Sequence, residues 1–183
     1  MQVSTVDNER QHVTDLNDDA WKRVAQRALH PTARPVGADV LAAIAAGLAA
    51  VTLPWELGHD EDSTQRRFHR VLTTDAYEAW VICWPSGESL DMHDHGGSAG
   101  AFSVVSGELD EATIDAGVEV VRTIRRGDTA AFGASRVHAV ANRGDTVATS
   151  VHVYSPPLSS MVYYAPDGSG SLVAVGEDAG GWG

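Results

Sequence analysis

The stretch HDHGGSAG, residues 93–100, places two histidines, His93 and His95, one residue apart. On a β-strand both side chains would point to the same face, because strand residues alternate between faces. His93 and His95 would then be able to bind one metal ion inside a β-barrel. The same pattern also fits two histidines that line a barrel without a metal, or two histidines on its surface.

The sequence around this pair consists of short β-rich segments that are separated by Gly, Pro and Asp. Short strands with turn residues between them are typical of antiparallel barrels and sandwiches. No helical repeat lies between them, which disfavours a parallel α/β sheet. We expect strands over residues 77–84, 100–105, 118–124, 136–141 and 147–154.

Two segments before the β-rich region have the period of an amphipathic helix. Their apolar positions are Leu16, Ala20, Val24 and Ala28 in the first segment, and Leu41, Ile44, Leu48 and Val51 in the second. Glycines become frequent near the C-terminus. We therefore expect three parts: a helical segment (1–55) that packs on the outside of the barrel, the barrel itself (56–165), and a loosely ordered glycine-rich tail (166–183).

The chain has 183 residues, 43% of them hydrophobic, and a formal net charge of −12. This acidity argues against binding to nucleic acids or to anionic membrane surfaces. The longest apolar run, residues 40–53, is shorter than the roughly 20 residues that span a bilayer. A single cysteine, Cys83, excludes an intrachain disulfide, whereas eight histidines invite a search for a metal site. We expect a cytoplasmic protein, monomeric or weakly self-associating, that binds neither nucleic acid nor membrane.

A third histidine, His138, lies in a second motif. The first motif reads G-x5-H-x-H from Gly87, and the second reads G-x10-H-x3-N from Gly127. These are the spacings of the two cupin motifs, and the chain resembles a cupin. The resemblance implies a mainly β, cupin-type double-sheet β-barrel (jelly roll) in which His93, His95 and His138 bind one metal ion.

The chain departs from the usual cupin pattern at two places. The glutamate ligand of the first motif would fall at Ala99 or Gly100, and the proline and glycine of the second are replaced by Gly133 and Ser135. The expected site is therefore three neutral histidines without a carboxylate ligand. Such a set also suits zinc, so a zinc hydrolase or a metal-dependent isomerase is an alternative, and the spacing does not separate iron from zinc or nickel.

Three stretches together narrow the family: HDHGGSAG (93–100), VVSGELDE (104–111) and SVHVYSPPLSSM (150–161). Their joint occurrence resembles the thiol dioxygenases, in particular bacterial cysteine dioxygenase (type I), over roughly residues 68–161. The resemblance implies a mononuclear non-haem Fe(II) site. It also implies an oxidoreductase that adds both atoms of O2 to the sulfur of a small thiol.

The resemblance assigns roles to individual residues. The three histidines of the two motifs are expected to bind Fe(II). Tyr154 is expected to be the active-site phenol, with His152 and Ser150 in a hydrogen-bonding relay that orients its hydroxyl. Alternatively, His152 is a core histidine whose hydrogen bonds are satisfied locally.

Arg70 stands where the family places the arginine whose planar fork binds the substrate carboxylate. Arg66 and Arg67 lie close enough in sequence to take that role instead, in which case Arg70 would be a salt-bridged surface arginine. Gly100 stands where the mammalian enzymes carry a cysteine that is crosslinked to the tyrosine. We therefore expect no Cys-Tyr crosslink in this chain.

The activity implied by the resemblance is oxidation of L-cysteine with O2 to cysteine sulfinate, a reaction of cysteine catabolism. Two alternatives remain: a dioxygenase for 3-mercaptopropionate or another small thiol, and a non-catalytic metal-binding cupin. Enzymes for 3-mercaptopropionate typically carry glutamine in place of the arginine, so Arg70 favours cysteine.

Overall fold

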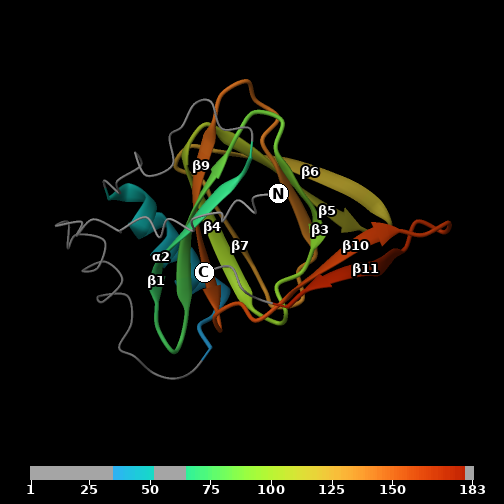
Figure 1. Cartoon of the computed structure of the whole chain (residues 1–183), viewed down its shortest axis with the longest axis horizontal. Coiled ribbons are helices and arrows are strands. Elements are labelled where there is room, and N and C mark those ends of the chain that lie inside the picture. The colour runs from blue at the N-terminus through green and yellow to red at the C-terminus, as the bar shows by residue number, and fades with distance from the viewer. Residues whose placement is uncertain (1–34, 52–64, 180–183) are drawn as a thin grey trace, which may run out of the picture.

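The computed structural model describes residues 35–51 and 65–179, which form one helix and two antiparallel sheets (Figure 1). The elements are α2 (Ala38–Ala50), β1 (Arg67–Thr73), β2 (Glu78–Trp84), β3 (Ser89–His93), β4 (Ala99–Ser106), β5 (Glu108–Asp115), β6 (Val118–Arg125), β7 (Thr129–Phe132), β8 (His138–Ala141), β9 (Ala148–Ser155), β10 (Met161–Pro166) and β11 (Leu172–Asp178). The expected first helix, residues 16–28, lies outside the described residues. No described helix is long and apolar enough to cross a membrane.

The two sheets pack face to face and enclose the interior of a barrel. The first has the strand order β1-β2-β9-β4-β7, and the second has the order β11-β10-β3-β8-β5-β6. The paired strands run antiparallel in both sheets. This arrangement confirms the predicted mainly β, double-sheet barrel of the cupin type.

The central strand of the first sheet, β9, is buried along its whole length. Its residues alternate between two hydrophobic clusters, because Val151 and Val153 pack toward α2 while Tyr154 packs inside the barrel. On α2, Leu41, Ile44 and Leu48 are fully buried against the first sheet. Each of these side chains contributes roughly 1.5–3 kcal/mol by leaving water. The helix α2 therefore packs on the outside of the barrel.

The sequence-based strands are all present, with ends shifted by one or two residues. The expectation of a loosely ordered tail is wrong for residues 172–178, because they form β11 and pair with β10. Among the glycines that suggested disorder, Gly168 and Gly170 belong to the β10–β11 turn, where Gly170 has a φ of 82°, and Gly176 lies within β11. The Asp167 carboxylate accepts hydrogen bonds from the backbone N–H groups of Ser169 and Ser171 and so stabilises this turn.

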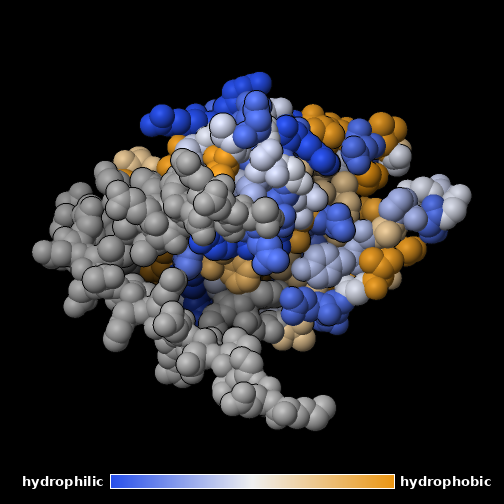
Figure 2. All heavy atoms as spheres, turned by 45° about the horizontal axis from the view of Figure 1, so that its top comes forward, coloured by the Kyte–Doolittle hydropathy of each residue, from blue (hydrophilic) through white to orange (hydrophobic). Residues whose placement is uncertain are grey.

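The outer strands of the second sheet keep apolar side chains on the surface. The exposed residues are Val118, Val120, Val121, Val173 and Val175. Figure 2 shows hydrophobic surface on the right-hand side, where the β5–β6 and β10–β11 hairpins lie. The packed interior lies between the central strands, where Trp84, Phe102 and Leu109 are buried.

Candidate metal centre

Three histidines from the two sequence motifs meet inside the barrel. His93 is the last residue of β3, His138 is the first residue of β8, and the two face each other as register partners. The side chains of His93, His95 and His138 each offer one ring nitrogen, and these nitrogens all lie within 4.8 Å of one another. The three residues are 1–2% exposed. The structure thus brings together all three of the expected metal ligands.

His95 does not lie on a β-strand, contrary to the expectation that it shares a strand face with His93. It lies beyond the end of β3, in a turn in which Gly96 and Gly97 have φ values of 57° and 87°. Strand alternation therefore does not place it. The turn is held by Asp94, whose carboxylate accepts hydrogen bonds from the Gly96 and Val162 backbone N–H groups and from the Tyr164 hydroxyl.

Burial favours the neutral form of His93 and His95, and neutral imidazole is the form that binds metals. Burial, with a smaller effect from the charge of His138, lowers the pKa of His93 to about 3. Burial and the two neighbouring histidines also hold the pKa of His95 well below its usual range. Both ring nitrogens of His95 are buried and lack a hydrogen-bond partner among the described residues. A buried polar atom without a partner is costly, so a metal ion bound to His95 fits this site.

In two of the three candidate ligands, His93 and His138, the ring Nδ1 atom contacts a hydrogen-bond acceptor. His93 Nδ1 lies 2.7 Å from the backbone oxygen of Asp91, and His138 Nδ1 lies 2.6 Å from Oε1 of Glu111. Both oxygens can only accept, so both Nδ1 atoms carry the hydrogen. The Nε2 atoms of His93 and His138 are therefore free to bind a metal.

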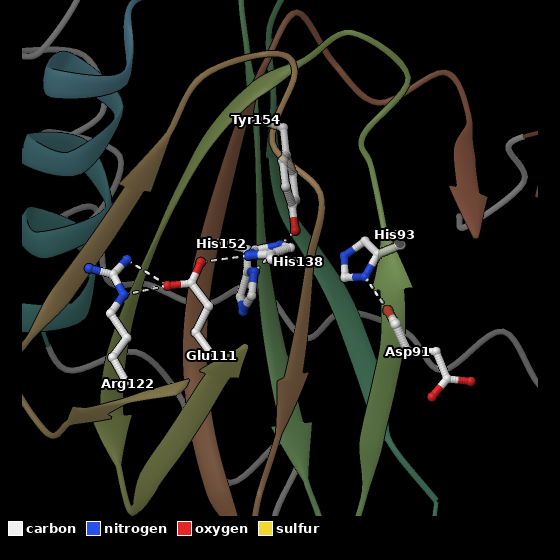
Figure 3. Close-up of polar contacts among 7 residues, drawn as sticks. All are labelled: Asp91, His93, Glu111, Arg122, His138, His152 and Tyr154. Carbon is white, nitrogen blue, oxygen red and sulfur yellow. Dashed lines mark hydrogen bonds and ion pairs between the residues drawn. The ribbon is translucent and has the colours of Figure 1, made fainter. Parts of the chain in front are cut away.

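Sequence reasoning missed Glu111. The residue is 1% exposed on β5, and its carboxylate contacts His138 on one side and Arg122 on the other (Figure 3). Burial alone would raise the pKa of Glu111, but the contacts with His138 and Arg122 outweigh it and lower that pKa. The sequence offered one signal for its burial: Glu111 lies two residues from the core residue Leu109 on the same strand, and residues two apart on a strand share a face.

The expected relay is present beside the histidines. Ser150 Oγ lies 2.8 Å from His152 Nε2, and His152 Nδ1 lies 3.0 Å from the Tyr154 hydroxyl. These residues alternate with buried outward-facing ones along β9, so all three share its interior face. The Tyr154 ring also stacks on His95, with ring centroids 5.1 Å apart.

A buried tryptophan sets the direction of this relay. The Trp84 indole N–H donates to Ser150 Oγ at 2.9 Å. Ser150 is fully buried, and its own hydrogen finds an acceptor among the described residues only at His152 Nε2. His152 Nδ1–H must then donate to the Tyr154 oxygen, which leaves the phenol hydrogen free for another acceptor. Burial, and the charge of Glu78, raise the pKa of Tyr154 well above its usual range, so this hydrogen is retained at neutral pH.

The three candidate arginines occupy different positions. Arg70 is 44% exposed, and its Nη1 lies 3.7 Å from Glu78 Oε2. Arg67 pairs in register with Cys83, and its charge affects the Cys83 thiol, on the face away from the relay. Arg66 lies over the Trp84 ring at 5.1 Å, and its buried Nη1 has no hydrogen-bond partner among the described residues.

Arg66 is also close enough to the histidines to act on them electrostatically. In addition to the larger effect of burial, its positive charge lowers the pKa of His93 and of His152. It also opposes the raised pKa of Tyr154. The structure therefore places an unpaired guanidinium nitrogen of Arg66 near the candidate site, whereas the partly exposed Arg70 is paired with the buried carboxylate of Glu78.

Comparison with known proteins adds a family and a set of similar folds. A family model described as cysteine dioxygenase type I matches residues 26–166. No curated protein sequence matches the chain. A protein from Thermus thermophilus is 17% identical, with a TM-score of 0.47 over 53% of this chain and 89% of that one. A conserved protein with a double-stranded β-helix domain from Klebsiella pneumoniae is 20% identical, with a TM-score of 0.46 over 62% and 87%. A cupin domain from Schizosaccharomyces pombe is 13% identical, with a TM-score of 0.45 over 50% and 61%.

Proposed function

Because the chain belongs to the cysteine dioxygenase type I family, we propose that it is an Fe(II)-dependent thiol dioxygenase that oxidises L-cysteine to cysteine sulfinate in the cytoplasm. The observation that carries this proposal is the convergence of three buried histidines beside the Tyr154 side chain. The reaction joins one thiol and one O2 to give one sulfinic acid. The thiol sulfur supplies all four electrons, so no further reductant is needed.

His93, His95 and His138 would hold the metal, and each would contribute one neutral nitrogen ligand. When bound, Fe(II) would supply open coordination positions and the positive charge that favours the thiolate form of the substrate. No carboxylate lies in the proposed ligand set, so the substrate itself would bring the negative charge. This requirement favours a thiol over a neutral substrate.

The relay would supply one hydrogen-bond donor of fixed direction. Because Trp84 donates to Ser150, and Ser150 to His152, the phenol hydrogen of Tyr154 would be free to donate to a bound substrate. This donor can orient a substrate carboxylate or the oxygen that is transferred. We propose that it works without a Cys-Tyr crosslink, because Gly100 is the register partner of Tyr154 and Cys83 lies beside Thr149 on the other face.

The substrate carboxylate would bind an arginine, and two candidates can be separated by experiment. Arg70 is the residue that the family pattern suggests, whereas burial and the missing partner favour Arg66. Loss of the correct arginine should raise KM for L-cysteine and lower kcat/KM by at least about tenfold, because a charge-assisted pair contributes about 1.5–3 kcal/mol. We expect this effect for Arg66→Ala and a smaller one for Arg70→Ala. The reverse order would return the role to Arg70.

The substrate itself is tested by comparing small thiols on the Fe(II)-loaded protein. We expect a higher kcat/KM for L-cysteine than for 3-mercaptopropionate or cysteamine, since cysteine has both a carboxylate and an amine. A higher kcat/KM for 3-mercaptopropionate would overturn the assignment of cysteine while keeping thiol oxidation. Absence of O2 uptake with every thiol in the presence of bound iron would overturn the proposed function.

A further inference from the structure

The carboxylate of Glu111 is buried in the barrel wall directly behind one candidate metal ligand. Its Oε1 lies 2.6 Å from Nδ1 of His138, on the side of the ring that faces away from His93 (Figure 3). Glu111 has no role in the proposed reaction, and it is too well buried to be a surface charge. A buried charge of this kind needs partners that outweigh the loss of its hydration.

Arg122 supplies the second partner. It is the register partner of Glu111 on the neighbouring strand β6, and its Nε lies 2.6 Å from Oε2 of Glu111. A second guanidinium nitrogen, Nη2, contacts the same oxygen. Arg122 is half exposed, so it links the interior carboxylate to the surface. Arg122, Glu111 and His138 thus form a continuous row from β6 through β5 to β8.

The three candidate ligands therefore differ in the group to which each imidazole ring donates a hydrogen bond. His138 donates to a carboxylate, His93 donates to a backbone carbonyl, and His95 has no hydrogen-bond partner among the described residues. A carboxylate behind an imidazole fixes its tautomer and orientation and makes its free nitrogen a stronger ligand. His138 should accordingly be the most firmly held of the three.

We propose that Glu111 is a positioning residue that directs Nε2 of His138 to the metal and strengthens metal binding, and that Arg122 holds Glu111 in place. The inference rests on the three-histidine metal site and is independent of which thiol is oxidised. It adds two residues, Glu111 and Arg122, that would support the metal site without binding the metal themselves. It also assigns a role to Glu111, the last residue of the stretch 104–111, for which the sequence analysis proposed no role.

The test is the affinity of the metal-free, full-length protein for Co²⁺ and for anaerobic Fe(II), measured by competition with a chromogenic chelator. Glu111→Gln keeps an acceptor oxygen but removes the charge, and Glu111→Leu removes both. We expect Kd to rise about tenfold in the first variant and about 100-fold in the second, the range typical of residues behind a metal ligand. Arg122→Gln should give an increase no larger than that of Glu111→Gln.

The matched control is Glu108→Gln on the same strand. Glu108 also pairs with an arginine of β6, Arg125, but both side chains are exposed and neither contacts a metal ligand. The Kd of the Glu108→Gln variant for either metal should stay within about twofold of the wild-type value, because an exposed ion pair of this kind contributes little to the structure. Metal-free stability is measured for each variant by urea unfolding, so that a folding defect is recognised.

A second measurement separates positioning from a general structural effect. In the His138→Ala background the protein keeps two ligands, and Glu111→Gln should then leave the remaining Co²⁺ affinity unchanged, because the residue acts only through His138. The Co²⁺ absorption spectrum of Glu111→Gln should also shift, because the bond to His138 weakens. A wild-type Kd for Glu111→Gln, or an equal loss in the His138→Ala background, would overturn this inference alone. Failure of the wild-type protein to bind either metal would overturn the metal site and the proposed function with it.

Discussion

Gly100 occupies a position where one added methyl group should have a large effect. It lies on β4, and its register partners are Tyr154 on β9 and Phe132 on β7. A Cβ atom at residue 100 would lie 2.5 Å from two ring atoms of Phe132 and 3.0 Å from Cδ1 of Tyr154. Carbon atoms in contact are normally about 3.5–4.0 Å apart. The Phe132 ring would therefore have to move by about 1 Å to restore that separation.

That movement is opposed by two of the candidate metal ligands, His95 and His138. The Phe132 ring lies with its centroid 4.7 Å from that of His95 and 4.8 Å from that of His138. Overpacking of a well-packed core typically costs about 1–3 kcal/mol. We expect Gly100→Ala to lower the free energy of unfolding by about 2 kcal/mol, roughly a 30-fold change in the unfolding equilibrium. Metal affinity should fall too, because the displaced ring pushes on His95 and His138.

Urea unfolding followed by tryptophan fluorescence measures the stability, and Gly133→Ala is the matched control. Gly133 has no heavy atom within 4 Å of its added Cβ, and its φ lies outside the left-handed region. The control should differ from wild type by less than about 0.5 kcal/mol. Phe132→Leu in the Gly100→Ala background should recover part of the loss. Equal stabilities for Gly100→Ala and Gly133→Ala would refute the close packing on which this reasoning rests.

The surroundings of the three histidines lead to three further predictions. Trp84→Phe removes the donor to Ser150, and kcat for thiol oxidation should fall roughly tenfold at unchanged metal affinity; an unchanged kcat would show that the relay direction does not matter. Asp94→Ala removes three hydrogen bonds from the turn that carries His95, so Kd for Co²⁺ should rise roughly tenfold, and an unaltered Kd would contradict this role. His93 has a pKa of about 3 in the metal-free fold and about 6.5 when unfolded, so the unfolded state binds more protons between these values. Stability should therefore be lost as the pH falls below about 6.5, by up to about 1.4 kcal/mol per pH unit for this residue. His93→Gln should show a shallower pH dependence in urea unfolding, and an identical slope would argue against a neutral buried His93.

The features of the fold that depend on local pattern were predictable from the sequence. The strands at 77–84 and 147–154 have apolar residues on both faces and turn residues at their ends, so predicting them required no knowledge of distant contacts. The strand β11 was missed because glycines surround a short apolar run. It forms because β10 offers it a pairing edge, which is a non-local contact.

The candidate site also combines residues that the sequence pattern indicated with one residue whose position depends on non-local contacts. The histidine spacings identified His93, His95 and His138, because motif spacing is a property of the sequence itself. The two-residue spacing from Leu109 did not by itself predict the burial of Glu111, since a charged residue in a hairpin is ordinarily solvated. Its burial depends on the register of β5 with both β6 and β8. Only that pairing brings His138 and Arg122 to opposite sides of one carboxylate.

The most direct test of the account is the fate of isotopically labelled O2 on the anaerobically Fe(II)-loaded protein supplied with L-cysteine. The account predicts cysteine sulfinate as the product, with both oxygen atoms derived from O2 and one O2 consumed for each sulfinate formed. His138→Ala should abolish the product, because the metal loses one of its three ligands. Sulfinate that carries oxygen from water, or iron-loaded protein that consumes no O2 with cysteine or any other small thiol, would contradict the central claim.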